Sequence, residues 1–351
     1  MTSLRTDHFT RTATLTLALL GSAFAATAAQ AADVNIYTSR QPELIQPVLD
    51  AFTEETGLST ATIFIDKGLE ERVKAEGANS PADLIMTVDI GRLDAAKQAG
   101  VVQPVTSSTL EANIPAEFRD TANEWFALTS RARVVYASKD RVDVDQITYK
   151  DLADPKWKGR LCTRSGQHQY NIALIAAYIA HHGEDAARDW VAGLRDNLAR
   201  RPEGGDRDQA KAIFAGECDI ALGNTYYVGK MATNEKEPEQ KDWAEAIKVI
   251  MPTFDNGLTH VNISGVSLAK NAPNRDNAVK LMEFLSSDEA QKIYAELNYE
   301  YPVEPGIETS ELVESFGDLK PDNLALDEIA RHRAKASEIV DEVNYDGGPQ
   351  S

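Results

Sequence analysis

Three short segments of the sequence place tyrosine where a strand is expected to give way to a helix. They span residues 37–41, 165–171 and 223–230. Binding residues collect at such junctions in α/β proteins, because the loops at the carboxyl ends of the strands meet there. A highly charged cation can drive a phenol, whose pKa is about 10, to lose its proton and act as an anionic oxygen ligand. The three segments are therefore the first candidates for a binding site.

The tyrosines and their polar neighbours also have simpler interpretations. Tyr226 and Tyr227 are adjacent, and adjacent residues on a helix point about 100° apart, so one of them can simply pack inward. Arg131 and Arg133 suit a salt bridge between two halves of the protein as well as an oxyanion site.

Known catalytic motifs are missing from the sequence. It contains no G-x-S-x-G, no H-E-x-x-H, no Walker loop and no G-x-G-x-x-G after the first expected strand. A pair of carboxylates for glycoside hydrolysis is recognised only by its spatial separation. Because these motifs are missing, we expect a protein that is not an enzyme. A secreted hydrolase that uses two carboxylates stays open as an alternative.

The hydrophobic pattern predicts an alternation of strands and helices. Strands are expected at 34–37, 60–65, 82–88, 133–138, 160–163, 218–223 and 265–269, and helices at 44–52, 68–76, 170–181, 186–198, 209–215 and, in two pieces, 277–297. This alternation predicts an α/β fold in which each lobe has a mixed, mainly parallel sheet flanked by helices. In this architecture ligands lie at the carboxyl ends of the strands, where the loops gather.

The length of 351 residues exceeds what a single core usually supports, so two lobes are expected. We assign residues 32–133 plus 262–310 to the first lobe and residues 134–261 to the second. Residues 311–351 are expected to form a C-terminal helical segment and a tail.

The first 31 residues have the pattern of a cleaved signal peptide. Arg5 and Arg11 precede an apolar stretch, and Ala29-Gln30-Ala31 offers the small residues that signal peptidase prefers. The expected location is the periplasm. In an exported chain, the only two cysteines, Cys162 and Cys218, favour a disulfide.

The chain has 36 basic and 55 acidic residues and a formal charge of -19. Nucleic-acid binding needs a basic patch that releases counterions from phosphates. We therefore expect no nucleic-acid partner, and we expect a monomer.

Six segments together resemble the periplasmic ferric-binding proteins of iron ABC transporters, in particular the branch of cyanobacteria and many proteobacteria. They are VNIYTSRQP (34–42), SPAD (80–83), LTSRARV (128–134), RSGQHQYN (164–171), GGDRDQ (204–209) and GNTYY (223–227). The resemblance covers nearly all of the chain after the signal peptide. It implies the two-lobed fold of periplasmic binding proteins, in which two α/β lobes close on iron in the cleft between them. The closed protein then docks on an inner-membrane ABC permease.

The resemblance also implies which residues hold the metal. The tyrosine of the 165–170 segment and the tyrosine pair match the family's phenolate ligands, which places iron on Tyr170, Tyr226 and Tyr227. Fe(III) is a hard ion that prefers anionic oxygen, and three phenolates offset its charge. The sequence leaves Fe(II) open as the cargo.

The first-lobe loop departs from some relatives, which carry a His-Tyr pair or a further tyrosine there. The resemblance implies that this lobe closes through a bound anion or water, with Arg40, Gln41 and Arg131 holding carbonate or another anion. An arginine fork suits this role because it donates paired hydrogen bonds to an oxyanion. Glu43 and His168 are further candidate ligands, and Tyr37 is expected to form a wall of the cleft. A small organic ligand or oxyanion, such as a polyamine, phosphonate or sulfate, is the alternative cargo in the same fold.

Overall fold

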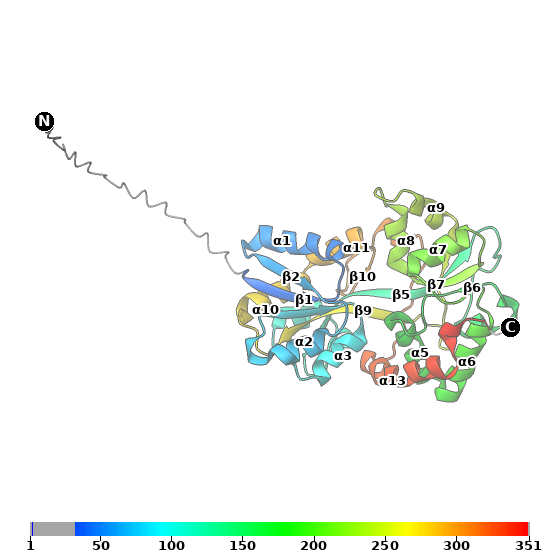
Figure 1. Ribbon diagram of the computed structural model, residues 1–351, viewed down its shortest axis with the longest axis horizontal. Helices are drawn as coiled ribbons and strands as arrows, with labels where there is room; N and C mark the ends of the chain where they lie inside the picture. Colours follow the sequence, from blue (N-terminus) through cyan, green and yellow to red (C-terminus); the bar gives the residue numbers. More distant parts are fainter. Residues whose placement is uncertain (1, 3–31, 350–351) are drawn as a thin grey trace. The chain divides into compact units, whose positions relative to one another are not determined.

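The computed structural model of the protein describes residue 2 and residues 32–349 (Figure 1). The predicted signal peptide, except for residue 2, thus lies outside the described residues. Within the described part of the chain, no helix is long and apolar enough to cross a membrane.

The strands form one mixed sheet, whose main path runs in the order β2-β1-β3-β9-β5-β7-β6. Off this path, β10 and β8 pair with β5, and β4 pairs with β9. The bounds are β1 Val34–Thr38, β2 Thr60–Phe64, β3 Leu84–Thr87, β4 Val102–Gln103, β5 Phe126–Ser138, β6 Leu161–Cys162, β7 Ile220–Asn224, β8 Ile247–Ile250, β9 Val261–Ala269 and β10 Tyr301–Pro302. The β1–β2, β1–β3 and β6–β7 pairs are parallel, as expected from the strand–helix alternation. The pairs made by β5 and β9 with their neighbours are antiparallel, which that alternation did not predict.

The long strand β5 connects the two groups of strands. It pairs with β9 from Phe126 to Ala132, and with β7 from Arg133 onward. This change of partner falls close to residue 133, where we placed the end of the first lobe. The division of the chain into these two lobes stays a prediction. Only the second half of β5 was predicted, because its first half places polar residues such as Thr129 and Arg131 at buried positions. A strand buried on both faces lacks the alternation by which strands are recognised.

Helices cover both faces of the sheet (Figure 1). The predicted helices are confirmed within a few residues, including the pair α10 and α11 expected at 277–297. The bounds are α1 Gln46–Thr56, α2 Leu69–Glu76, α3 Ile90–Gln98, α4 Ser108–Asn113, α5 Gln169–His182, α6 Glu184–Asp196, α7 Asp206–Phe214, α8 Thr225–Ala232, α9 Glu239–Glu245, α10 Arg275–Leu285, α11 Asp288–Asn298, α12 Glu311–Glu314 and α13 Leu326–Glu342.

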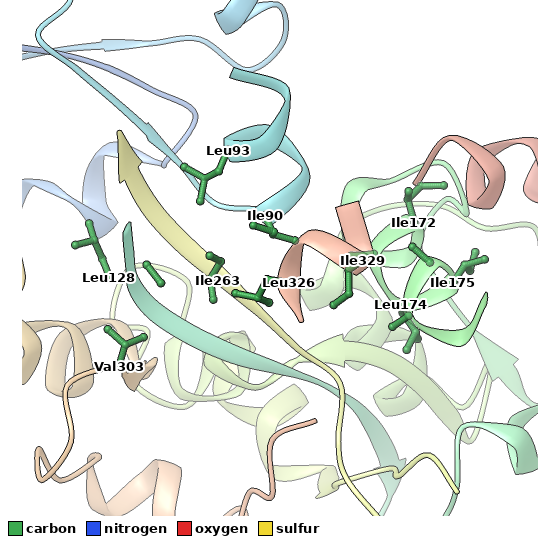
Figure 2. Packing of buried hydrophobic residues seen from close by; sticks show 14 of the residues in the cluster. Ile90, Leu93, Leu128, Ile172, Leu174, Ile175, Ile263, Val303, Leu326 and Ile329 are labelled. Atoms are coloured by element: carbon green, nitrogen blue, oxygen red, sulfur yellow. The ribbon is translucent and has the colours of Figure 1, made fainter. Parts of the chain in front are cut away.

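The C-terminal helix α13 packs against both α5 and α3. Figure 2 shows Leu326 and Ile329 of α13 between Ile90, which opens α3, and Ile172 of α5. Leu326, Ile329, Ala336, Ile339 and Val340 form the buried face of α13, at the spacing of an amphipathic helix. The C-terminal helix α13 is therefore part of the core. Its hydrophobic face packs against α5, the helix that carries Tyr170.

A buried histidine beside the start of β9 makes the fold sensitive to acid. His260 is 1% exposed, and its backbone amide donates to the Tyr149 hydroxyl at 3.2 Å. Burial lowers the pKa of His260 from 6.5 to about 4, and the attraction of Asp322 and Asp89 does not outweigh burial and the repulsion of Arg133 and Arg131. Between these two pKa values the unfolded chain takes up a proton that the folded chain excludes. Stability is therefore lost as the pH falls from 6.5 towards 4.

We expect His260→Gln to remove this part of the acid sensitivity. In the wild type, this difference in proton uptake should make the free energy of unfolding about 2 kcal/mol lower at pH 5 than at pH 7.5. Urea unfolding at both pH values measures the loss, and His332→Gln on α13 is the control, because His332 is only partly buried. An equal loss in wild type and His260→Gln would contradict the prediction.

Candidate functional site

Two parallel strands bring the tyrosine segments together. β6 and β7 are hydrogen-bonded neighbours and run in the same direction, so their carboxyl ends lie at one edge of the sheet. β7 ends at Asn224, and α8 begins at the next residue with Thr225, Tyr226 and Tyr227. β6 leads through a short loop into α5, whose second residue is Tyr170. Both strand-to-helix junctions therefore present tyrosine at the same place.

The three phenols are buried together at one cavity. Tyr170, Tyr226 and Tyr227 are 7%, 5% and 9% exposed, and they form a cluster of their own. The hydroxyl oxygens of Tyr170 and Tyr226 are 3.1 Å apart, and the ring centroids of Tyr226 and Tyr227 are 4.2 Å apart. The cavity that they line has a volume of about 180 Å³. The structure thus brings together the three residues that the sequence singled out as metal ligands.

The environment keeps the phenols of Tyr226 and Tyr227 protonated in the absence of a cation. Burial raises the pKa of Tyr226 well above its usual value, and Tyr170 and Tyr227 raise it further. Burial, followed by Tyr170 and Asp206, also raises the pKa of Tyr227. A ligand that needs phenolate oxygens must therefore bring enough positive charge to displace these protons.

The backbone under the tyrosine pair is held by a close contact with β5. The hydroxyl of Tyr136 donates to the carbonyl oxygen of Asn224 at 2.5 Å. The Tyr136 ring also lies against Gly223, where an added Cβ would come within 2.1 Å of the ring carbon Cζ. Glycine is thus required at position 223, since any side chain would displace the ring and with it the turn into α8.

Four arginine side chains surround the tyrosine rings. The guanidinium carbons of Arg131, Arg133 and Arg164 are 5.6, 5.9 and 5.2 Å from the centroid of the Tyr170 ring. Arg207 lies 5.1 Å from the centroid of the Tyr227 ring. Positive charge at these distances is attracted to the ring faces and would stabilise a phenolate by Coulomb attraction.

The predicted anion-binding residues differ in how many donors they have free. Arg40 is buried and its guanidinium is bound to Glu300, to Ser264 Oγ at 2.6 Å and to the carbonyl oxygen of Leu44 at 3.3 Å. Arg131 is also buried and donates to Ser264 Oγ at 3.2 Å, but its Nε and Nη2 have no partner among the described residues. Both side chains line the cavity. Arg131, more than Arg40, therefore has hydrogen-bond donors to offer an anion.

The remaining candidates are placed unequally. Gln41 and His168 line the cavity. His168 caps α5, since its Nδ1 accepts from the backbone amide of Tyr170 at 3.2 Å. Burial, and then Arg164, lower the pKa of His168 to about 3. With Nδ1 engaged and the ring neutral, the hydrogen lies on Nε2, so His168 orients Tyr170 and has no free lone pair.

Tyr37 and Glu43 lie away from the cavity. Tyr37 is fully buried in a separate core cluster, and its hydroxyl donates to Glu76 Oε1 at 2.9 Å. The expectation that Tyr37 forms a wall of the cleft is thus corrected. Its neighbours Ile36 and Thr38 on β1 face the opposite side of the sheet, because side chains alternate along a strand. Glu43 is exposed on the short turn Pro42–Leu44.

Sequence reasoning missed several residues of the cavity. Glu300, Ser264, Arg164, Phe64 and Asp66 also line it. Arg164 lies in the segment that carried the family resemblance, which is the one signal that pointed towards it. Glu300 and Ser264 belong to segments far from the tyrosines in sequence, and only the folding of β9 and the chain after α11 brings them to the site.

The donor set of the site favours a hard cation. Phenol oxygens converge here, whereas among residues 32–349 no group of three or more His, Cys, Asp or Glu side chains could hold a metal ion. Hard, highly charged ions prefer oxygen ligands. The arrangement can thus bind such a cation by exchanging phenolic protons for metal, with Arg131 available for an accompanying anion.

Comparison with known proteins identifies relatives along most of the chain. Residues 79–322 match the family described as bacterial extracellular solute-binding protein. Iron uptake protein A1 of Synechocystis sp. is 43% identical over 316 residues, which are 89% of this chain and 87% of the relative. These matches argue against the secreted-hydrolase alternative.

Solved structures agree with the sequence matches. The apo ferric ion-binding protein A of Pasteurella haemolytica superposes with a TM-score of 0.86 at 50% identity, covering 89% of this chain and 98% of that one. A Trichodesmium protein in complex with iron and citrate ligands superposes with a TM-score of 0.83 at 44% identity, covering 89% and 99%. These comparisons confirm the predicted α/β fold of a periplasmic binding protein.

Proposed function

Because the chain belongs to the bacterial extracellular solute-binding proteins, within the group of ferric iron-binding proteins, we propose that it captures Fe(III) for uptake. In this proposal, Tyr170, Tyr226 and Tyr227 supply phenolate oxygens to the ion. The protein works in the periplasm after removal of its signal peptide. Its two lobes close on the iron, and it delivers the iron to an ABC permease of the inner membrane.

The observation that carries the proposal is the burial of three phenols at one cavity. Two strand-to-helix junctions deliver them, and the Tyr170 and Tyr226 oxygens already lie 3.1 Å apart. Three neutral phenols in one buried cavity gain little from their proximity to one another. Three phenolates at the same place would balance the charge of Fe(III). Drug-sized organic ligands usually occupy pockets of about 300–1,000 Å³, which is larger than this cavity of about 180 Å³.

The proposal is tested by equilibrium dialysis of the metal-free protein. We expect stoichiometric uptake of iron from ferric citrate, and no uptake of 2-aminoethylphosphonate, sulfate or spermidine in the absence of metal. Binding of one of these compounds without metal, together with no retention of iron, would replace the proposal with the organic-ligand or oxyanion alternative.

We further propose that an anion completes the iron site and that Arg131 holds it. Arg131 has two buried nitrogen donors without a partner among the described residues, and such donors are costly unless a ligand satisfies them. A guanidinium binds carbonate or carboxylate through paired hydrogen bonds. The anion would also fill coordination positions that three tyrosines leave open.

We expect Arg131→Gln to lower the affinity for iron in bicarbonate buffer by about 10- to 100-fold, the range typical of groups that support metal ligands. The loss should be much smaller in buffer freed of bicarbonate, because the variant removes an anion contact. Arg141→Gln is the control, since Arg141 pairs with Asp219 and does not line the cavity. An unchanged dependence on bicarbonate in Arg131→Gln would contradict this role.

A further inference from the structure

We infer that Asp206 is the positioning residue of the site, because its one carboxylate joins the two segments that carry the tyrosines. The inference rests on the proposed function and adds a residue to it. Asp206 opens α7 and is fully buried. It is not itself among the residues that line the cavity.

The carboxylate is saturated by partners from three other parts of the fold. Its Oδ2 accepts from Arg133 Nη1 on β5 at 2.6 Å and from the backbone amide of Asn224 at 2.9 Å. Its Oδ1 accepts from Arg164 Nη1 at 3.2 Å. Asn224 is the last residue before α8, and Arg164 lies in the loop that leads to α5. Asp206 therefore touches both approaches to the tyrosines.

Arg133 extends this link to the residue beside Tyr170. Its Nη1 also donates to Asn224 Oδ1 at 3.1 Å, and its Nη2 donates to Asn171 Oδ1 at 2.8 Å. Asn171 in turn donates to the carbonyl oxygens of Arg164 and Ser165, both at 3.1 Å. A closed network thus runs from the start of α8 to the start of α5, and Asp206 is its only carboxylate.

Asp206 is free to turn inward because another residue caps its helix. Asp208 Oδ2 accepts from the backbone amide of Gly205 at 2.7 Å, which is the reciprocal half of a helix N-terminal capping arrangement. Gly204 adopts a left-handed φ of 66° just before it, a conformation that glycine adopts without strain. Asp208 therefore serves the helix end, and Asp206 serves the network under the tyrosines.

The network also sets the charge beside the phenols. Arg133 and Arg164 lie 5.9 and 5.2 Å from the centroid of the Tyr170 ring, and Asp206 neutralises one of these two positive charges. Removing the carboxylate would increase the positive potential at the ring. Because positive potential stabilises the electron pair that a phenolate donates, the phenolate-to-Fe(III) absorption band should move to shorter wavelength. A residue that only held the fold together would not shift the band.

The test is Asp206→Asn, with Asp219→Asn as the matched control. Asp219 is also paired with two arginines, through Arg141 Nε at 2.5 Å and Arg160 Nε at 2.6 Å. It precedes β7, at the end opposite to Asn224. We expect Asp206→Asn to bind iron about 10- to 100-fold more weakly with the band at shorter wavelength. Asp219→Asn should lose stability and keep the wild-type affinity and band.

Arg164→Gln provides a second variant if Asp206→Asn does not fold, because it removes the hydrogen bond from Arg164 to Asp206 Oδ1 and keeps the Arg133–Asp206 pair. Its iron affinity should fall, and loss of the Arg164 charge should move its band to longer wavelength; wild-type affinity would overturn the link from Asp206 to the approach to α5. Wild-type affinity and an unshifted band in the folded variants would overturn the role of Asp206. A wild-type protein without any band would overturn the proposed function itself, so the two failures are distinguishable.

Discussion

Tyr227→Phe is expected to lower the affinity for Fe(III) by at least about 100-fold, more than the loss typical of groups that only support a ligand. The substitution removes one oxygen and keeps the ring, which packs 4.2 Å from the ring of Tyr226. The stability of the metal-free protein should change little, because within residues 32–349 the Tyr227 hydroxyl makes no hydrogen bond that joins α8 to another element of the fold. Competition with a chelator of known affinity measures the loss.

Tyr37→Phe is the matched control for this experiment. Tyr37 is also buried, but its hydroxyl is bound to Glu76 and does not face the cavity. We expect the iron affinity of Tyr37→Phe to equal that of the wild type. Wild-type affinity in Tyr227→Phe would remove this residue from the site, and the same result for Tyr170→Phe and Tyr226→Phe would refute tyrosine coordination altogether.

Loss of the disulfide is expected to have the largest effect on stability. Cys162 and Cys218 are joined across 56 residues, as predicted, and both are buried. Closing a loop of this length restricts the unfolded chain by about 4 kcal/mol. Cys162→Ala/Cys218→Ala should therefore lower the free energy of unfolding by about this amount, measured by denaturant unfolding under non-reducing conditions.

The same variant separates stability from binding. The disulfide joins the last residue of β6 to a residue just before β7, and neither cysteine lines the cavity. We expect the iron affinity of Cys162→Ala/Cys218→Ala to stay near that of the wild type at temperatures where the variant is folded. A loss of less than about 1 kcal/mol would show that the unfolded chain is already restricted by other means.

The sequence predicted the parts of the site that depend on local pattern. The helix of Tyr170 and the strand before Tyr226 follow from hydrophobic periodicity, and their parallel strands place both tyrosines at one edge of the sheet. The disulfide followed from the number of cysteines and the exported character of the chain. These features are determined within short stretches, where spacing alone carries the information.

The parts that depend on distant contacts could not be predicted in this way. Arg40 was expected to hold an anion, but its charge is matched by Glu300, which is 260 residues further along the chain. From their residue types alone, Arg131 and Arg133 suited a salt bridge as well as an oxyanion site, and only the family resemblance favoured Arg131. In the structure, Arg133 pairs with Asp206, whereas Nε and Nη2 of Arg131 have no partner among the described residues. Buried charges need partners, and the sequence does not say which partner the fold provides.

The most direct test of tyrosine-bound iron is the visible absorption spectrum of the purified protein, before and after addition of ferric citrate. Charge transfer from phenolate to Fe(III) should give a broad visible band that disappears when a strong chelator removes the metal and weakens in Tyr226→Phe. The absence of any band with excess ferric citrate would contradict coordination by Tyr170, Tyr226 and Tyr227.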